Sequence, residues 1–398
     1  MKNNIFPAFL LLILIFSCKK NEINLDLEYN DKVPNIGQVV NIEHALINNV
    51  KLVKRYLIPY SNDSLDNYAY PEISSLNDST LIMIAKSSKS NIVDNGKASL
   101  IQLLSSNKGL TWQKSLDFSK SFPKAINSSM PSLVRINKNK VLLIYLIKYS
   151  NKRIDLKVEV SNDNCKTWGS PITIGGENVG YQIINNSRAI KIGKRILIPV
   201  SIPDKGNMST YRVGNSKLSV FCYYSDDEGL TWNKTKAIRT DKYDLLEPGI
   251  VSVGGNEILM NIRTDIGKVL FARSFDLGLN WQFEESNIES PSSPQTIVKI
   301  PNSNNLVMVW NDNNKNVSIH GGNRSPLSLA VSSNSGKNWK KLLNIESEDR
   351  SKKDYSYSAI QFDEEYIYIV YNERDNLTGK FAVKMTRLLI NDITSGLN

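Results

Sequence analysis

Side chains that could bind or transform an acidic ligand recur near the ends of expected strands. Glu247 begins one strand-forming segment, and Arg263 ends the next one, 16 residues later. A guanidinium binds a carboxylate through two parallel hydrogen bonds, a geometry that lysine cannot reproduce. The alternative is that Glu247 and Arg263 pair only with each other, at the protein surface.

Further candidates lie outside that segment. Arg324 stands one expected strand before a repeated motif at residues 332–339, Tyr355 and Tyr357 follow that motif, and Asp94 precedes an expected strand at residues 99–104. Carboxyl and phenol groups can act as general acids, general bases or nucleophiles. Each candidate also has a purely structural alternative. The tyrosines could pack within a strand, and Asp94-Asn95-Gly96 is a favourable solvent-exposed turn.

Metal and histidine chemistry have little support in the sequence. The two histidines, His44 and His320, are isolated, with no Cys, His or carboxylate at ligand spacing. Apart from Cys18, the cysteines are Cys165 and Cys222, which fall in different expected units, so we expect two free or buried thiols. The sequence therefore predicts no metal site, no serine-type triad and no cofactor.

The chain is basic overall. Its net charge is +10 and its isoelectric point is about 9.2. Such a charge can concentrate an acidic ligand, although lysine-rich surface loops without any ligand would give the same number. No cluster of Lys and Arg interleaved with aromatic residues indicates nucleic-acid binding.

The N-terminal residues are typical of a bacterial lipoprotein signal. Met1-Lys2 is followed by an apolar run, residues 5–16, and then by Ser17-Cys18. We expect cleavage of residues 1–17 and lipidation of Cys18, because the apolar run is too short for a permanent transmembrane helix. Residues 18–45 are expected to form a tether. Lys19 and Lys20, with no Asp after the cysteine, favour attachment to the outer membrane, on either its periplasmic or its outer face.

The elements that must position the candidate residues are short strands. Segments such as residues 141–147, 217–224 and 366–371 are rich in β-branched and aromatic residues and are bounded by Asn, Ser, Gly or Pro. A motif of the form Ser-x-Asp-x-Gly-x-Thr-Trp also recurs five times. Its copies read SSNKGLTW (105–112), SNDNCKTW (161–168), SDDEGLTW (225–232), SFDLGLNW (274–281) and SSNSGKNW (332–339). The motif predicts a rigid hairpin turn, because Asp or Asn can bond to nearby backbone, Gly accepts a positive φ and Trp anchors the turn.

These motifs resemble the Asp-box (BNR) repeats of sialidases and related glycan-active enzymes. The resemblance implies an all-β chain, folded as a six-bladed β-propeller over residues 46–398. Five boxes leave one blade without a box. We expect residues 48–58 to add a strand to the C-terminal strands, residues 356–391, and so to close the ring.

The resemblance also implies roles for the candidate residues. Tyr357, in a Tyr-Ser segment at the start of the final blade, corresponds to the sialidase nucleophile, with Tyr355 as the alternative. Glu247 would deprotonate this phenol, and Asp94 would serve as the acid and base. Arg263 and Arg324 would bind the substrate carboxylate. A neutral phenol avoids the repulsion that an anionic nucleophile would meet beside that carboxylate.

One departure from the sialidase pattern affects substrate choice. Ala69, before Tyr70-Pro71, stands where sialidases carry the first arginine of their carboxylate-binding triad. Another cation would have to replace it, and the candidates are Lys86, Lys89 and especially Arg188, at the start of the expected third blade. Otherwise the substrate is not a sialic acid.

Together these features predict an exo-acting, sialidase-like glycoside hydrolase. We expect a lipid-anchored monomer that releases a terminal acidic sugar from a glycan or glycoconjugate, with retention of configuration. Two alternatives stay open: another propeller enzyme, either a hydrolase or a lyase of uronate-containing polysaccharide, and a non-catalytic glycan-binding lipoprotein.

Overall fold

Nearly all regular structure among the described residues of this protein is β-structure. The computed structural model describes residues 40–60, 67–89, 96–118, 122, 124–176, 179–203, 218–313, 323–347, 349 and 351–395. These residues fall in one compact unit. Cys18, the signal segment and residues 18–39 of the expected tether lie outside the described residues. Within those residues, no helix has the length and apolar character that a membrane span requires.

The described strands form five sheets. The first sheet contains β1 (Val40–Ile47), β2 (Val50–Ile58), β24 (Lys353–Phe362), β25 (Tyr366–Asp375) and β26 (Phe381–Leu389), in the order β1-β2-β26-β25-β24. A short helix, α1 (Ile390–Thr394), follows β26.

The largest sheet combines two antiparallel runs. One run is β3 (Asn67–Ser75), β4 (Leu81–Ser88), β5 (Ala98–Ser105) and β6 (Gln113–Asp117). The other is β7 (Asn127–Arg135), β8 (Val141–Ser150), β9 (Arg153–Ser161) and β10 (Ile172–Ile174). A single parallel residue pair, Ala98 with Asn127, joins the two runs.

The other three sheets follow in chain order. The third sheet contains β11 (Ile190–Ile192), β12 (Arg195–Pro203), β13 (Leu218–Ser225), β14 (Asn233–Lys234) and β15 (Ile238–Arg239). The fourth contains β16 (Leu246–Gly254), β17 (Glu257–Arg263), β18 (Leu270–Ser274) and β19 (Gln282–Glu284). The fifth contains β20 (Thr296–Lys299), β21 (Leu306–Asn311), β22 (Leu327–Ser332) and β23 (Lys340–Glu346).

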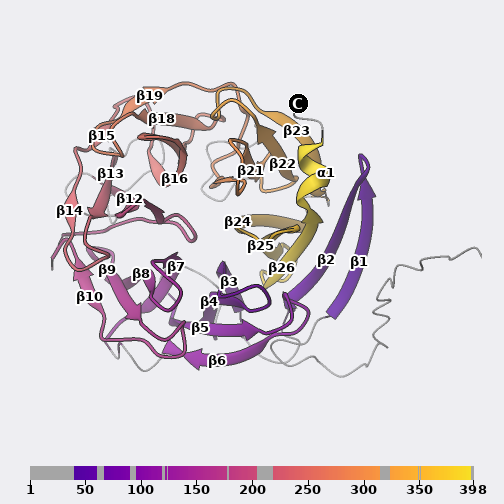
Figure 1. Cartoon of the computed structure of the whole chain (residues 1–398), viewed down its shortest axis with the longest axis horizontal. Helices are drawn as coiled ribbons and strands as arrows, with labels where there is room; N and C mark the ends of the chain where they lie inside the picture. Colours follow the sequence, from indigo (N-terminus) through magenta and orange to yellow (C-terminus); the bar gives the residue numbers. More distant parts are fainter. Residues whose placement is uncertain are drawn as a thin grey trace, which may run out of the picture. The chain divides into compact units, whose positions relative to one another are not determined.

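The sheets are arranged in a ring as a propeller (Figure 1). Strands β3, β7, β12, β16 and β24 lie nearest the middle, and β6, β10, β14 and β19 lie at the rim. Apolar side chains fill the space between neighbouring sheets, as where Leu197 of β12 packs with Ile250 of β16 and Met260 of β17. These innermost strands, β3, β7, β12, β16 and β24, therefore carry the side chains that can face the centre. The expected all-β propeller is confirmed.

The ring closes between the two ends of the chain. Strand β2 pairs with β26, which confirms the strand expected at residues 48–58. A buried charge network reinforces this junction, because Lys384 Nζ lies 2.6 Å from Glu346 Oε1 and 3.1 Å from Glu373 Oε2. Lys54 of β2 adds a contact of 3.3 Å to Glu346.

Strand β1 begins at Val40 and therefore includes residues 40–45, which the sequence assigns to the tether. The segment is a strand because its backbone pairs with β2, with Ala45 opposite Leu52. Ala45 and Ile47 also pack against an apolar cluster of the first and fifth sheets. This tertiary pairing is not visible in the local sequence.

The Asp boxes form the hairpin turns that their sequence predicts. In the third box, the Gly229 N–H donates to Ser225 Oγ at 2.8 Å and the Thr231 N–H donates to Asp227 Oδ1 at 2.9 Å. The Trp232 indole donates to the Gly229 carbonyl at 3.1 Å, which folds the ring back over the turn. In the second box, Cys165 adopts a φ of 67° in place of the glycine. Cys165 and Cys222 are both buried free thiols, as expected.

The box glycine also joins neighbouring sheets. Gly229 has a φ of 90°, and a β-carbon at this position would lie 2.8 Å from Leu142 Cδ1 on β8 of the preceding run. The same relation recurs at Gly278, which faces Leu197 of β12, and at Gly336, which faces Leu259 of β17. Each of these boxes is thus both a turn and a contact with the sheet before it.

We predict that Gly229→Ala destabilises the protein more than Gly176→Ala. Both glycines have a φ near 90°, but a β-carbon at Gly176 would meet nothing within 4 Å. The left-handed backbone should destabilise both variants, and the crowding against Leu142 should add about 1 kcal/mol or more in Gly229→Ala alone. Thermal or urea unfolding of the two variants measures this difference. Equal loss of stability would contradict the role of the box in inter-sheet packing.

Candidate active site

A hydrogen bond between Tyr357 and Glu247 lies at the centre of the ring. The Tyr357 hydroxyl donates to Glu247 Oε1 at 3.1 Å, across 110 residues of sequence. Tyr357 belongs to β24 and Glu247 to β16, so the contact joins two sheets that are not adjacent in the chain. Both side chains are buried. The phenol proton therefore already points at a carboxylate oxygen that could accept it.

Arg263 holds the other oxygen of the same carboxylate. Its Nη1 lies 2.7 Å from Glu247 Oε2, and its Nε donates to Ser292 Oγ at 3.2 Å. Arg263 ends β17, where it stands opposite Leu246, the residue before Glu247. The strand register thus places the guanidinium beside the carboxylate, and the positive charge balances the negative one.

Both members of the central pair have an unusual backbone. Glu247 has a φ of 41° and Tyr357 a φ of 56°, in the left-handed region that such residues seldom occupy. Each stands within a register shift of its strand, between Leu246 and Gly249 in β16 and between Ser356 and Ala359 in β24. Strain of this kind, of order 1–3 kcal/mol per residue, persists where the surrounding structure imposes it and is concentrated at functional sites.

Arg324 is the most available cation at this site. Its guanidinium carbon lies 5.2 Å from the centroid of the Tyr357 ring, and its Nη1 donates to Ser356 Oγ at 3.1 Å. The side chain is half-buried, its Nε has no hydrogen-bond partner, and no carboxylate in the described part of the chain lies within ion-pair distance of it. This guanidinium could therefore bind an anion placed over Tyr357.

Arg188 lies in the buried layer around the central pair and is only 3% exposed. Its Nη1 donates to the carbonyls of Ser187 and Ser358, and its Nη2 donates to Thr296 Oγ1 at 3.0 Å. Burial lowers the pKa of Arg188 to about 10, while the charges of Glu247, Glu72 and Tyr357 act in the opposite direction. Because these hydrogen bonds already occupy the guanidinium, Arg188 is better placed to stabilise the site by its charge than to contact a ligand directly.

Tyr355, the alternative nucleophile, has different neighbours. Its ring packs against Tyr371 with centroids 6.2 Å apart, and it is 1% exposed. The hydroxyl that donates to Glu247 is that of Tyr357. The described part of the chain therefore pairs Glu247 with Tyr357.

The site also contains residues that the sequence does not single out. The Tyr70 ring meets the Tyr357 ring edge-on, with centroids 4.6 Å apart. The Asn186 amide donates to the carbonyls of Pro71 at 2.6 Å and Tyr357 at 3.1 Å, so it ties β3 to β24. One signal for Tyr70 was present in the sequence, because Tyr70-Pro71 has the same form as Glu247-Pro248.

The remaining sequence candidates lie apart from this pair or beyond the description. Asp94 is outside the described residues. Ala69 is fully buried, and its strand partner is Lys86. Lys89 follows the end of β4 and is exposed. No group of three or more His, Cys, Asp or Glu side chains within the described ranges is arranged to bind a metal ion.

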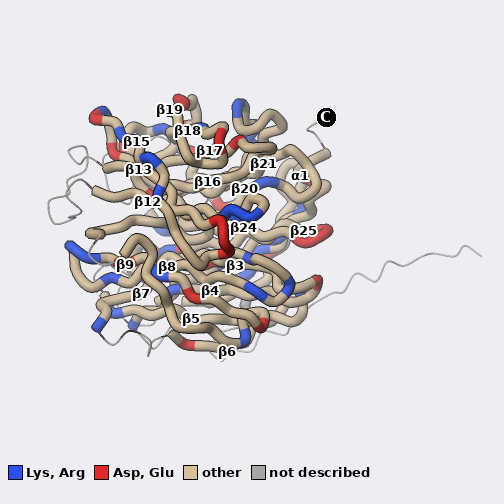
Figure 2. The backbone as a smooth tube through the Cα atoms, turned by 60° about the vertical axis from the view of Figure 1, so that its left-hand side comes forward, with Lys and Arg blue, Asp and Glu red and all other residues tan. Residues whose placement is uncertain are grey.

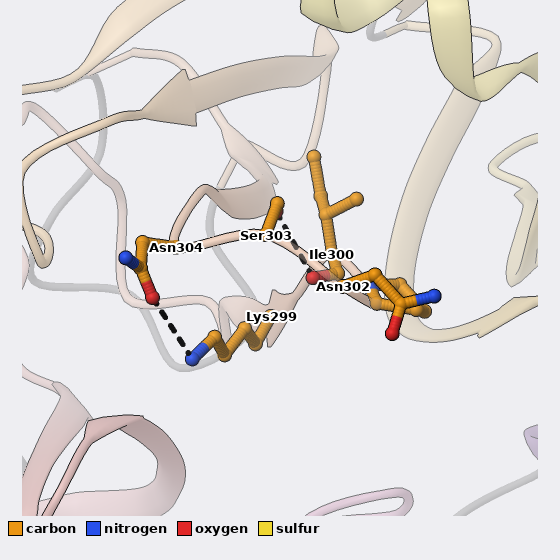
Figure 3. Close-up of a pocket in the computed structure, with 6 residues that line it drawn as sticks. Lys299, Ile300, Asn302, Ser303 and Asn304 are labelled. Carbon is orange, nitrogen blue, oxygen red and sulfur yellow. Dashed lines mark hydrogen bonds between the residues drawn. The ribbon is translucent and has the colours of Figure 1, made fainter.

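A surface pocket lies at the turn between β20 and β21, away from this chemistry. Figure 3 shows its lining residues, where Lys299 Nζ donates to Asn304 Oδ1 at 3.4 Å and Ser303 Oγ donates to the Ile300 carbonyl at 3.0 Å. The lining contains no carboxyl, imidazole, thiol or phenol group, and Ser303 Oγ donates to a backbone carbonyl and not to a base, so the pocket is a weak candidate for catalysis. The Tyr357–Glu247 pair, in contrast, combines a phenol with a carboxylate that can accept its proton.

The basic charge is not gathered in one place on the side drawn in Figure 2. Lys and Arg positions are interspersed with Asp and Glu over the sheets. The net charge of +10 therefore does not by itself define a binding surface. The local arginines around Tyr357 are the more specific feature.

Comparisons with known proteins agree with the repeats and the fold. A family model described as a BNR repeat-like domain matches residues 182–369, which include Glu247, Arg263, Arg324 and Tyr357. No curated protein matches the sequence.

Several solved structures are similar in fold. The sialidase of Trypanosoma rangeli, as a covalent intermediate with 2,3-difluorosialic acid, has a TM-score of 0.67 at 16% identity, over 87% of this chain and 59% of that chain. A protein of unknown function from Dyadobacter fermentans has a TM-score of 0.64 at 18% identity, over 85% of this chain and 99% of that chain. The NanB sialidase of Streptococcus pneumoniae has a TM-score of 0.62 at 14% identity, over 85% of this chain and 71% of that chain.

These matches cover most of this chain but only part of the sialidase chains, and the sequence identities are low. The chain spans about three fifths of the length of the T. rangeli sialidase chains that it matches. At such identities the likeness establishes the fold. The chain thus combines BNR repeats with the propeller fold of sialidases.

Glu72 carries a buried carboxyl group near this site, and its ionisation should make the stability of the fold depend on pH. Burial raises the pKa of Glu72 to about 8, although hydrogen bonds from Ser187 and Leu133 and the charge of Arg188 lower it. An unfolded glutamate has a pKa of about 4.3. Between these values the folded protein binds the proton and the unfolded chain does not, so the free energy of unfolding falls as the pH rises.

Glu72→Gln should remove this part of the pH dependence. The melting temperature of the variant should fall less than that of the unmodified protein between about pH 4.3 and pH 8. Glu364→Gln, at an exposed turn between β24 and β25, is the matched control and should leave the slope unchanged. The same slope in Glu72→Gln as in the unmodified protein would show that Glu72 ionises normally in the fold.

Proposed function

We propose that this protein, a BNR-repeat chain with the sialidase fold, is an exo-acting glycoside hydrolase that releases a terminal acidic sugar from glycans. The observation that carries the proposal is the chain of contacts from the Tyr357 hydroxyl to Glu247 Oε1, at 3.1 Å, and from Glu247 Oε2 to Arg263, at 2.7 Å. A phenol needs a base to become a nucleophile, and this geometry supplies one.

The proposed reaction has two steps with retention of configuration. In the first, Tyr357 Oη bonds to the anomeric carbon as the glycosidic C–O bond breaks, Glu247 accepts the phenol proton, and an acid protonates the leaving oxygen. In the second, water attacks the anomeric carbon, the C–O bond to Tyr357 breaks, and Glu247 returns the proton to the phenolate. A neutral nucleophile suits a substrate whose carboxylate lies on the anomeric carbon, because it avoids charge repulsion.

The acid of the first step is assigned to Asp94 on the sequence resemblance alone. The same residue would deprotonate the attacking water in the second step. Comparing Asp94→Ala on an aryl glycoside and on a natural glycan tests this role. A good aryl leaving group needs little protonation, so the variant should lose much more activity on the natural glycan. Equal losses on both substrates would count against Asp94 as the acid.

The proposed substrate carboxylate binds at Arg324, assisted by Arg263. Arg324 can offer a charged hydrogen bond to a ligand above Tyr357, whereas Arg263 already bonds Glu247. Arg188, which its position in the sequence put forward as a replacement for the arginine absent at Ala69, acts in this proposal by its charge on the Glu247–Tyr357 pair. Its guanidinium already donates to the Ser358 carbonyl and to Thr296 Oγ1, which supports this change of role.

The six-blade count is also part of the proposal. It treats the two antiparallel runs of the largest sheet, β3–β6 and β7–β10, as separate blades, because a single residue pair joins them. The other sheets would contribute one blade each. Residues 18–39 would connect this propeller to a lipidated Cys18 at the outer membrane, and release of a Cys18→Ser protein from the membrane fraction would test that anchor.

Ala69 favours a second candidate function. The residue is buried and uncharged at the position where sialidases place an arginine. A hydrolase or lyase of uronate-containing polysaccharide would not need the full sialidase set of cations. In a lyase, Tyr357, having given its phenol proton to Glu247, would remove the proton at C5 of the uronate. The bond to the leaving oxygen at C4 would break as an acid protonates that oxygen, and the product would carry a C4–C5 double bond.

The activity test uses the protein without residues 1–18, assayed on sialylated, uronic-acid-capped and neutral glycans. We expect release of free acidic sugar, and a loss of at least about a hundredfold in Tyr357→Phe, because phenylalanine has no hydroxyl to attack or to share a proton. Tyr355→Phe is the matched control, since Tyr355 packs against Tyr371 and should retain activity within a few-fold.

The outcomes separate the candidate functions. An unsaturated product that absorbs ultraviolet light would replace the hydrolase by the lyase. Binding of acidic glycans without any turnover would support a glycan-binding protein and reject both enzymes. Equal activity of Tyr357→Phe and the unmodified protein would remove Tyr357 from the mechanism.

A further inference from the structure

The same backbone irregularity recurs on four of the innermost strands of the ring, β3, β7, β16 and β24. Register shifts lie between Ala69 and Glu72 in β3, Ser129 and Ser132 in β7, Leu246 and Gly249 in β16, and Ser356 and Ala359 in β24. Within each shift one non-glycine residue has a φ between 41° and 57°, and these residues are Tyr70, Met130, Glu247 and Tyr357. The proposed base and nucleophile thus occupy equivalent positions, and Tyr70 occupies the same position in β3.

This equivalence extends to the neighbouring strand. Opposite the start of the shift in β16 lies Arg263 of β17, and opposite the start of the shift in β3 lies Lys86 of β4. In β8 and β25 the equivalent residues are Leu146 and Asn372, which carry no charge. Lys86 is therefore the cation that corresponds in position to Arg263, and it is paired across the strands with Ala69.

Lys86 lies close to the central pair. It is only 2% exposed, and its ammonium lies 5.4 Å from the centroid of the Tyr70 ring. The Tyr70 ring in turn meets Tyr357 edge-on at 4.6 Å, and Arg324 lies over Tyr357 at 5.2 Å. Two tyrosine rings in contact thus have a cation beside each of them, Lys86 at Tyr70 and Arg324 at Tyr357.

We propose that Lys86 is a further ligand-positioning residue, which binds the carboxylate of the terminal sugar from the side of Tyr70 while Arg324 binds it from the side of Tyr357. This inference rests on the proposed function, because it names a contact of the same site. It assigns to β4 the positive charge that Ala69 cannot supply from β3. Tyr70 serves as the apolar floor between the two cations.

The lysine side chain determines which part of the ligand Lys86 would recognise. An ammonium is a compact charge with rotatable donors, whereas a guanidinium demands a planar, two-point fit. Lys86 should therefore respond to the presence of a carboxylate and much less to the rest of the sugar.

The test compares carboxylates with their esters. Calorimetry should measure binding of N-acetylneuraminic acid and glucuronic acid, and of the methyl ester of each, to the protein without residues 1–18. Lys86→Met should weaken binding of the preferred acid by about ten- to a hundredfold, the range for losing one hydrogen bond to a charged group. Binding of its methyl ester should change little. Lys86→Arg should recover part of the affinity.

Lys89→Met is the matched control, because Lys89 is an exposed lysine just beyond the same strand. It should bind both acids as the unmodified protein does. If Lys86→Met binds the acid as tightly as the unmodified protein, or loses acid and ester equally, the assignment is overturned while the proposed function stands. If the unmodified protein binds neither acid, the proposed function fails and the assignment fails with it. The melting temperature of Lys86→Met, measured alongside, separates lost folding from lost binding.

Discussion

The bond from Tyr357 to Glu247 is the interaction on which this structure's chemistry depends. It joins two residues 110 positions apart in the sequence across the ring, and both residues have a backbone in the left-handed region. Arg263 then balances the carboxylate charge, and Asn186 fixes the Tyr357 carbonyl against Pro71 of β3. Residues of three sheets therefore position the Tyr357 phenol. Loss of any of these hydrogen bonds would let the left-handed backbone at Tyr357 or Glu247 return to a more favourable conformation.

The rest of the propeller supplies the rigidity that this arrangement needs. The Asp boxes stand at the turns and press their glycines against the preceding sheet, as Gly229 does against Leu142. The pairing of β2 with β26 closes the ring, and the Lys384, Glu346 and Glu373 network bonds that junction. The repeats are thus mainly a means of positioning, and the proposed chemistry is carried by residues that differ from one innermost strand to the next.

The sequence predicts the scaffold better than the site. Turn chemistry is local, so the boxes reveal the all-β repeat directly, and the closing strand follows from the need to cover a sheet edge. The sequence does not distinguish whether Tyr355 or Tyr357 contacts Glu247, because residues two apart lie on one face of a regular strand. The register shift between Ser356 and Ala359 gives them different neighbours. Lys86 and Tyr70 depend on strand pairing and ring contacts, which no local pattern records, and Asp94 is still a prediction from sequence.

The most direct measurement is the chemical identification of a covalent intermediate. The protein without residues 1–18 would be incubated with 2,3-difluorosialic acid, the compound seen as a covalent intermediate in the T. rangeli sialidase, and then digested for peptide mass spectrometry. Our account predicts a sugar adduct on Tyr357 that Tyr355→Phe retains and that Glu247→Gln forms more slowly. Turnover of sialosides with the adduct on another residue, or with none on Tyr357, would contradict the assignment of Tyr357 as nucleophile.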